Sequence, residues 1–77
     1  MTNEEFARRF INMYYGLDPR VFPTFMERFH NILEDFGYFN EWRKHWNLNN
    51  RPDGILITLL ENEIFKRELE KLMFMMI

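Results

Sequence analysis

Residues 54–60, Gly-Ile-Leu-Ile-Thr-Leu-Leu, decide the fold class, because this run could form either a buried strand or a helix. A lone strand would leave backbone N–H and C=O groups without partners, and the sequence offers no second strand-like run to pair with it. Asp53 precedes the run in the position of a helix N-cap. We therefore predict a helix from Asp53 onward, with a strand as the alternative.

Apolar residues continue from this run to the end of the chain at helical spacing. They are Ile57, Leu60, Ile64, Phe65, Leu69, Leu72, Met73 and Met76. One long C-terminal helix is the preferred prediction. A break near residue 58 is the alternative, because Thr58 and Glu61 have the spacing of a capping box.

The first half of the chain predicts two further helices. Thr2 to Glu5 form a capping box, so a helix should cover residues 3–15, and Gly16 should end it in the left-handed conformation. Asp18 should cap a helical turn at 19–22. A second helix is expected over 23–36, where the apolar residues again follow a helical period before Gly37.

A shorter third helix is expected after Asn40, which would be its N-cap. The aromatic residues of the three helices should supply most of the core, since the chain holds nine Phe, three Tyr and two Trp. Those with helical spacing are Phe6, Phe10, Phe25, Phe29, Phe36, Trp42 and Trp46. The predicted fold is all-α: one domain over residues 1–77, a three- to four-helix orphan bundle with a longer C-terminal helix.

Composition excludes several classes of protein. With no cysteine, the chain has no disulfide and no thiolate metal site. Its apolar runs are far shorter than the ~20 residues of a membrane span, and its acidic N-terminus is unlike a signal peptide, so we expect a cytoplasmic protein. A net charge of -2 gives no overall attraction to nucleic acid.

Glu27 and His30 have the E-x-x-H spacing found in di-iron helical bundles. Such a centre needs a second pair and further carboxylates, and Glu41 with His45 is one residue out of register. The sequence also lacks serine and a glycine-rich phosphate loop. We therefore expect no metal, no cofactor and no enzymatic activity.

The end of the chain is the first candidate site. Apolar residues occupy all sides of its last helical turn, and a small domain cannot bury all of them. Together with two aromatic residues in excess of the helical stripes, the predicted partner-binding residues are Met73, Phe74, Met75, Met76, Ile77, Tyr38 and Phe39. The alternative is that the last helix runs through the core of its own domain.

The second candidate site is basic. Arg43, Lys44 and Arg51 lie in a stretch that also contains two tryptophans, so cations could contact phosphates while rings stack on bases. The preferred interpretation is that both tryptophans face the core, which leaves an ordinary charged surface.

These observations predict a small protein-binding module, an inhibitor or adaptor that occupies the surface of a protein partner. In size and composition the chain resembles the small proteins that phages and mobile elements use against host machinery. A helical DNA-binding regulator is the alternative function. A self-associating structural protein, such as a homodimer, is the third.

Overall fold

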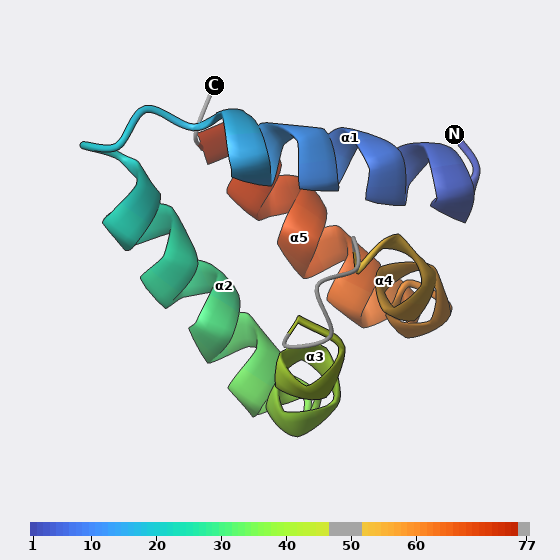
Figure 1. Ribbon diagram of the computed structural model, residues 1–77. Helices are drawn as coiled ribbons and strands as arrows, with labels where there is room; N and C mark the ends of the chain where they lie inside the picture. The colour runs from blue at the N-terminus through green and yellow to red at the C-terminus, as the bar shows by residue number, and fades with distance from the viewer. Residues whose placement is uncertain (47–51, 76–77) are drawn as a thin grey trace.

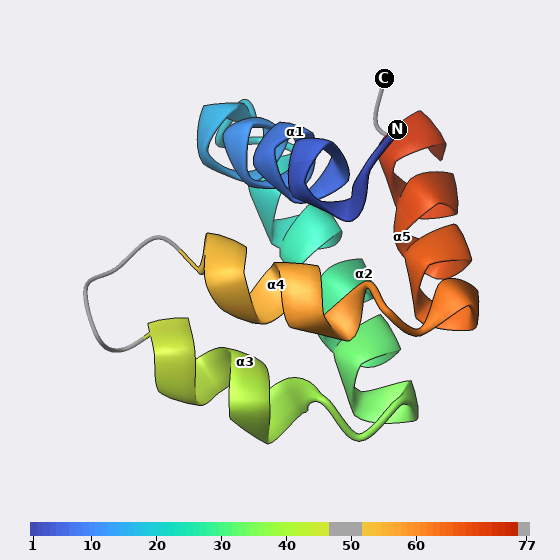
Figure 2. The same cartoon turned by 90° about the vertical axis from the view of Figure 1, so that its right-hand side faces the viewer.

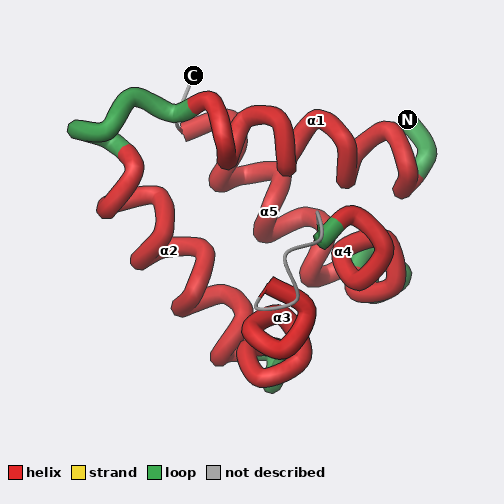
Figure 3. The backbone as a smooth tube through the Cα atoms, viewed as in Figure 1, coloured by secondary structure: helices red, strands yellow, loops and turns green. Residues whose placement is uncertain are grey.

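The computed structural model describes residues 1–46 and 52–75, which contain five helices and no strand (Figures 1 and 3). The helices are α1 (Asn3–Gly16), α2 (Phe22–Asp35), α3 (Phe39–Trp46), α4 (Asp53–Leu59) and α5 (Glu63–Met75). Residues 54–60 belong to a helix, as expected from the lack of a pairing strand. The all-α prediction is thus confirmed.

The helices pack in an order that leaves one side open. The closely packed pairs are α1 with α4, α4 with α3, α3 with α2, and α2 with α5. Figure 2 shows α1, α4 and α3 one below another, with α5 on the other side and α2 behind. Helices α1 and α5 lie at the two ends of this packing order, and they are not one of the closely packed pairs.

The predicted N-terminal elements are present, with one correction. The Thr2 hydroxyl caps α1 by accepting from the backbone N–H of Glu5 at 3.1 Å. Gly16 does not end α1 in the left-handed conformation as predicted. It is the last helical residue, and the extended backbone of Leu17 carries the chain away. Gly37 does adopt a positive φ, 74°, where the chain turns from α2 into α3.

Two predicted N-caps are wrong by one or two residues. Asn40 lies inside α3, which already begins at Phe39, and Asp53 is the first residue of α4 with Pro52 as its N-cap. Asp18 does cap the turn before α2, because its Oδ1 accepts from the backbone N–H of Arg20 at 2.8 Å. Side-chain oxygens of this kind favour several positions near a helix start, so sequence alone does not fix the residue.

The preferred single C-terminal helix is also wrong, because the chain breaks between α4 and α5. The break does not use Thr58, whose hydroxyl donates to the carbonyl of Gly54 at 3.2 Å within α4. Asn62 makes it instead: its Oδ1 accepts from the backbone N–H groups of Ile64 and Phe65 at 3.0 and 3.2 Å. As a result α5, with 13 residues, is no longer than α1 or α2, with 14 each.

Aromatic side chains from α1, α2 and α3 meet at the centre of the domain. The Phe29 ring lies 4.9 Å from that of Phe10 and 4.8 Å from that of Trp42, between centroids. Tyr14 packs edge-on against Phe25 and Trp42, and burial raises its pKa to about 12. The predicted core aromatics are therefore buried, apart from a half-buried Phe36. The side chain of Trp46 lies outside what the structure describes.

Substitutions of Asn62 test whether its side chain stabilises the break between α4 and α5. Its Nδ2 also donates to the Tyr38 hydroxyl at 3.1 Å. Asn62→Ala removes a helix cap and a half-buried hydrogen bond, so it should lower the free energy of unfolding by about 1–3 kcal/mol in urea denaturation. Asn62→Asp keeps the capping acceptor and should cost less. Equal losses in the two variants would show that the cap does not stabilise the break.

Candidate functional site

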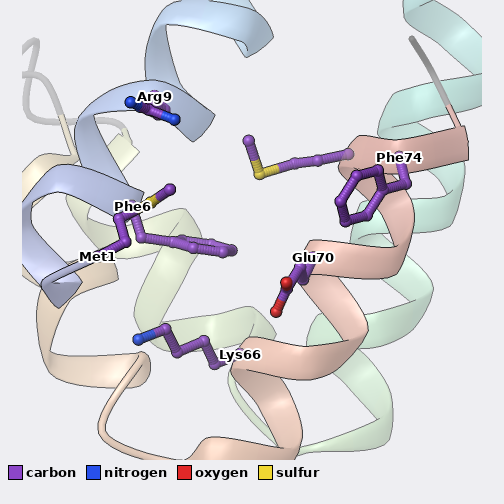
Figure 4. A pocket seen from close by; sticks show the side chains of 7 residues that line it. Met1, Phe6, Arg9, Lys66, Glu70 and Phe74 are labelled. Atoms are coloured by element: carbon purple, nitrogen blue, oxygen red, sulfur yellow. The ribbon is translucent and has the colours of Figure 1, made fainter.

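A groove of about 400 Å³ separates α1 from α5 on the open side of the domain (Figure 4). One wall comes from α1 and the residue ahead of it, and the other from α5. The lining residues are Met1, Phe6, Arg9, Lys66, Glu70, Met73 and Phe74. The groove exists because α1 packs on α4 while α5 packs on α2, so these two walls do not close on each other.

The inner part of the groove is apolar. Phe6 belongs to the core and is only 4% exposed, and Met73 is half-buried against the same core. Phe74 is 71% exposed and Met1 is 65% exposed. An aromatic ring and a thioether thus remain in water beside an apolar surface that they could help to cover.

Lys66 joins the two walls at one end of the groove. Its Nζ donates to Asn3 Oδ1 at 2.7 Å and lies 5.8 Å from the centroid of the Phe6 ring. This distance is within the range of a cation–π contact. Figure 4 shows Lys66 away from Arg9 and Phe74, which lie toward the other end. The groove is therefore bridged at one end and open at the other.

Opposite charges lie on the two walls. Arg9 projects from α1 and Glu70 from α5, and both are exposed (Figure 4). Within residues 1–46 and 52–75, neither side chain forms an ion pair with another described residue. Both charges are therefore available to a molecule that enters the groove.

The predicted C-terminal residues differ in how exposed their side chains are. Phe74 and Met75 are exposed, whereas Met73 packs against the core. Arg28 on α2 approaches the Met75 sulfur, with Nη1 3.7 Å from Sδ. Met76 and Ile77 lie outside the described residues. The last described turn of α5 thus has a core side and an exposed side, which combines the two alternatives left open by the sequence.

Tyr38 and Phe39, the other predicted partner-binding residues, take part in helix packing. The Tyr38 ring lies 5.1 Å from that of Phe65, and its hydroxyl accepts from Asn62. The Phe39 ring lies 5.1 Å from the imidazole of His30. Both are half-buried against the core and away from the groove. Their role in partner binding stays a prediction.

Of the three cations in the basic candidate site, the two that the structure describes lie on the surface. Arg43 and Lys44 are exposed on α3, and Arg51 lies outside the described residues. Trp42 is 2% exposed and packs against Phe29, so its ring cannot stack on a base. The preferred interpretation of Trp42 as a core anchor is confirmed.

The E-x-x-H pair gains no further ligands in the part of the chain that the structure describes. No three His, Asp or Glu side chains come together there in a group that could hold a metal ion. His30 is half-buried between Phe29 and Phe39. This desolvation lowers the pKa of His30, and the nearby carboxylate of Glu34 opposes the shift only in part.

Sequence reasoning missed five of the seven groove residues. The sequence pattern assigns Phe6 to the core, which it also joins, and no pattern distinguishes Met1, Arg9, Lys66 and Glu70. Helical periodicity shows which side of each helix is apolar. It does not show which two helices stay apart, and that separation creates the groove.

Fold and site together define a small all-α domain with an apolar groove on its surface. A scan against protein-family models matched none, and searches of curated proteins and of solved structures returned no significant match. No helix in the described part of the chain is long and apolar enough to cross a membrane.

His30 makes the stability of the domain dependent on pH. Since its pKa is lowered in the folded state, the unfolded chain takes up a proton first as the pH falls. The contribution of His30 to stability is therefore retained above its unfolded pKa and declines as the pH drops through that value. From about pH 8 to about pH 5, the wild type should lose more stability than His30→Gln in urea denaturation.

His45→Gln is the matched control for this prediction, because it removes the other histidine of the chain. A change in pH dependence that both variants share would come from the loss of an imidazole and not from the position of His30. Parallel stability curves for the wild type and His30→Gln would contradict the prediction. An NMR titration of the His30 ring would measure the lowered pKa directly.

Proposed function

We propose that this chain is a small non-catalytic protein-binding module, an inhibitor or adaptor that works by occupying the surface of a protein partner. The proposal rests on one observation: Phe74 stands 71% exposed beside an apolar groove between α1 and α5. Exposed aromatic and methionine side chains next to a pocket are typical of binding surfaces, where they act as anchors.

The chemistry of the groove supports a protein ligand. An apolar side chain of a partner could contact Phe6 and Met73 while Phe74 covers it from outside. The charged groups are exposed at the rim, where they favour one orientation of a partner over others.

The surface of α3 gives weaker support to nucleic-acid binding. Arg43 and Lys44 are exposed, but the neighbouring Trp42 is committed to the core. The acidic balance of the whole chain, -2, also opposes association with a phosphate backbone. We therefore favour a protein partner.

Phe74→Asp tests the proposal. Immobilised wild-type protein, presented to a lysate of the source organism, should retain a protein in stoichiometric amount. Phe74→Asp should lose at least nine-tenths of this captured protein, because a buried charge replaces an apolar anchor. The expected loss of affinity is about tenfold, or about 1.4 kcal/mol. Mass spectrometry identifies the captured protein.

Ile64→Asp is the matched control. Ile64 lies on the same helix and is 66% exposed, but it does not line the groove. This variant should capture the same protein as the wild type. Equal capture by wild type and Phe74→Asp would overturn the proposed surface, and recovery of nucleic acid in place of protein would overturn the proposed function.

A further inference from the structure

Two exposed residues of opposite charge face the groove from its two walls. Arg9 stands on the α1 wall and Glu70 on the α5 wall, and within the described residues neither is paired with a charge of its own chain (Figure 4). In a twofold-symmetric contact between identical chains, a residue away from the axis meets a different residue of the other copy, and the exchange is reciprocal. Such a contact can place Arg9 of each copy against Glu70 of the other.

We propose that a second copy of this chain occupies the groove, in a symmetric dimer with two reciprocal Arg9–Glu70 ion pairs. The inference rests on the proposed function in that the groove is the docking surface, and it names the first partner of that surface. It goes beyond the C-terminal residues predicted from sequence, because the pairing depends on a cation of α1.

The apolar residues fit the same arrangement. Phe74 and Met1 are exposed on opposite sides of the groove, above the more buried Phe6 and Met73. When two copies meet face to face, the Phe74 ring of each can cover the apolar floor of the other. Burial of apolar surface in the centre with charges at the rim is the usual composition of a protein interface.

Charge complementarity favours a second copy over a strongly charged partner. An acidic segment would be attracted by Arg9 and repelled by Glu70, and a basic segment would meet the reverse. An identical chain supplies both charges in the required places. Lys66 keeps its charge but lies at the bridged end of the groove, away from Arg9, where its ammonium group donates to Asn3 (Figure 4).

Sedimentation equilibrium of the purified full chain, over roughly 10 µM to 1 mM, tests the proposal. The wild type should dimerise. Arg9→Glu places two carboxylates face to face at both ends of the interface, and Glu70→Arg places two cations there. Each variant alone should therefore have a dimer Kd at least about tenfold higher than the wild type.

An equimolar mixture of the two variants provides the decisive measurement. In a heterodimer of Arg9→Glu with Glu70→Arg, both contacts again join opposite charges. The mixture should dimerise nearly as well as the wild type, although neither variant does so alone. Rescue of this kind requires position 9 of one copy to lie near position 70 of the other.

Arg8→Glu is the matched control, because Arg8 is exposed on α1 next to Arg9 but does not line the groove. It changes the net charge as Arg9→Glu does and should leave the dimer Kd unchanged. Circular dichroism of each variant, with helix content equal to that of the wild type, confirms that loss of the dimer does not reflect unfolding.

Three outcomes would overturn the inference: a monomeric wild type, single variants that dimerise normally, or a mixture that shows no rescue. The proposed function fails by a different result, since it depends on capture from the lysate being sensitive to Phe74→Asp. A monomer that still captures a protein through Phe74 would retain the proposed function and reject the second copy.

Discussion

The aromatic cluster around Phe29 is the contact on which the rest of the domain depends. Its ring touches Phe10 from α1 and Trp42 from α3, so three helices are fixed against one another at a single buried point. Aromatic rings bury a large area per residue, roughly 150–250 Å² each, which suits a chain of 77 residues with no disulfide. The rings thus give short helices, of at most 14 residues, a common buried centre.

A second, smaller group of rings holds α5. Phe65 lies between Phe36 and Tyr38, at 5.3 and 5.1 Å, and this attaches α5 to the end of α2 and to the turn that follows it. Toward α1, by contrast, α5 is joined by the Lys66–Asn3 hydrogen bond at one end. Strong attachment on one side and a polar bridge on the other explain why the groove opens between α1 and α5.

This arrangement also separates the residues that stabilise the fold from those of the proposed binding surface. The residues that fix the helices are buried, whereas Phe74, Arg9 and Glu70 are exposed and can be changed without removing a core contact. The groove therefore combines an apolar floor, which the core supplies, with a rim that carries Arg9 and Glu70. A protein that occupies the groove would contact residues from both ends of the sequence.

The sequence by itself determined that the chain is all-α and that Phe29 and Trp42 are buried. It also located α1, α2 and the start of α3 to within about two residues, because helical periodicity and capping are local properties. It did not determine the break at Asn62, since Thr58 offered an equally good capping pattern nearby. Only the tertiary structure decided that Asn62 makes the break, where its side chain also reaches Tyr38. Only the tertiary structure brought Arg9 opposite Glu70, because the distance between two helices depends on contacts between residues far apart in the chain.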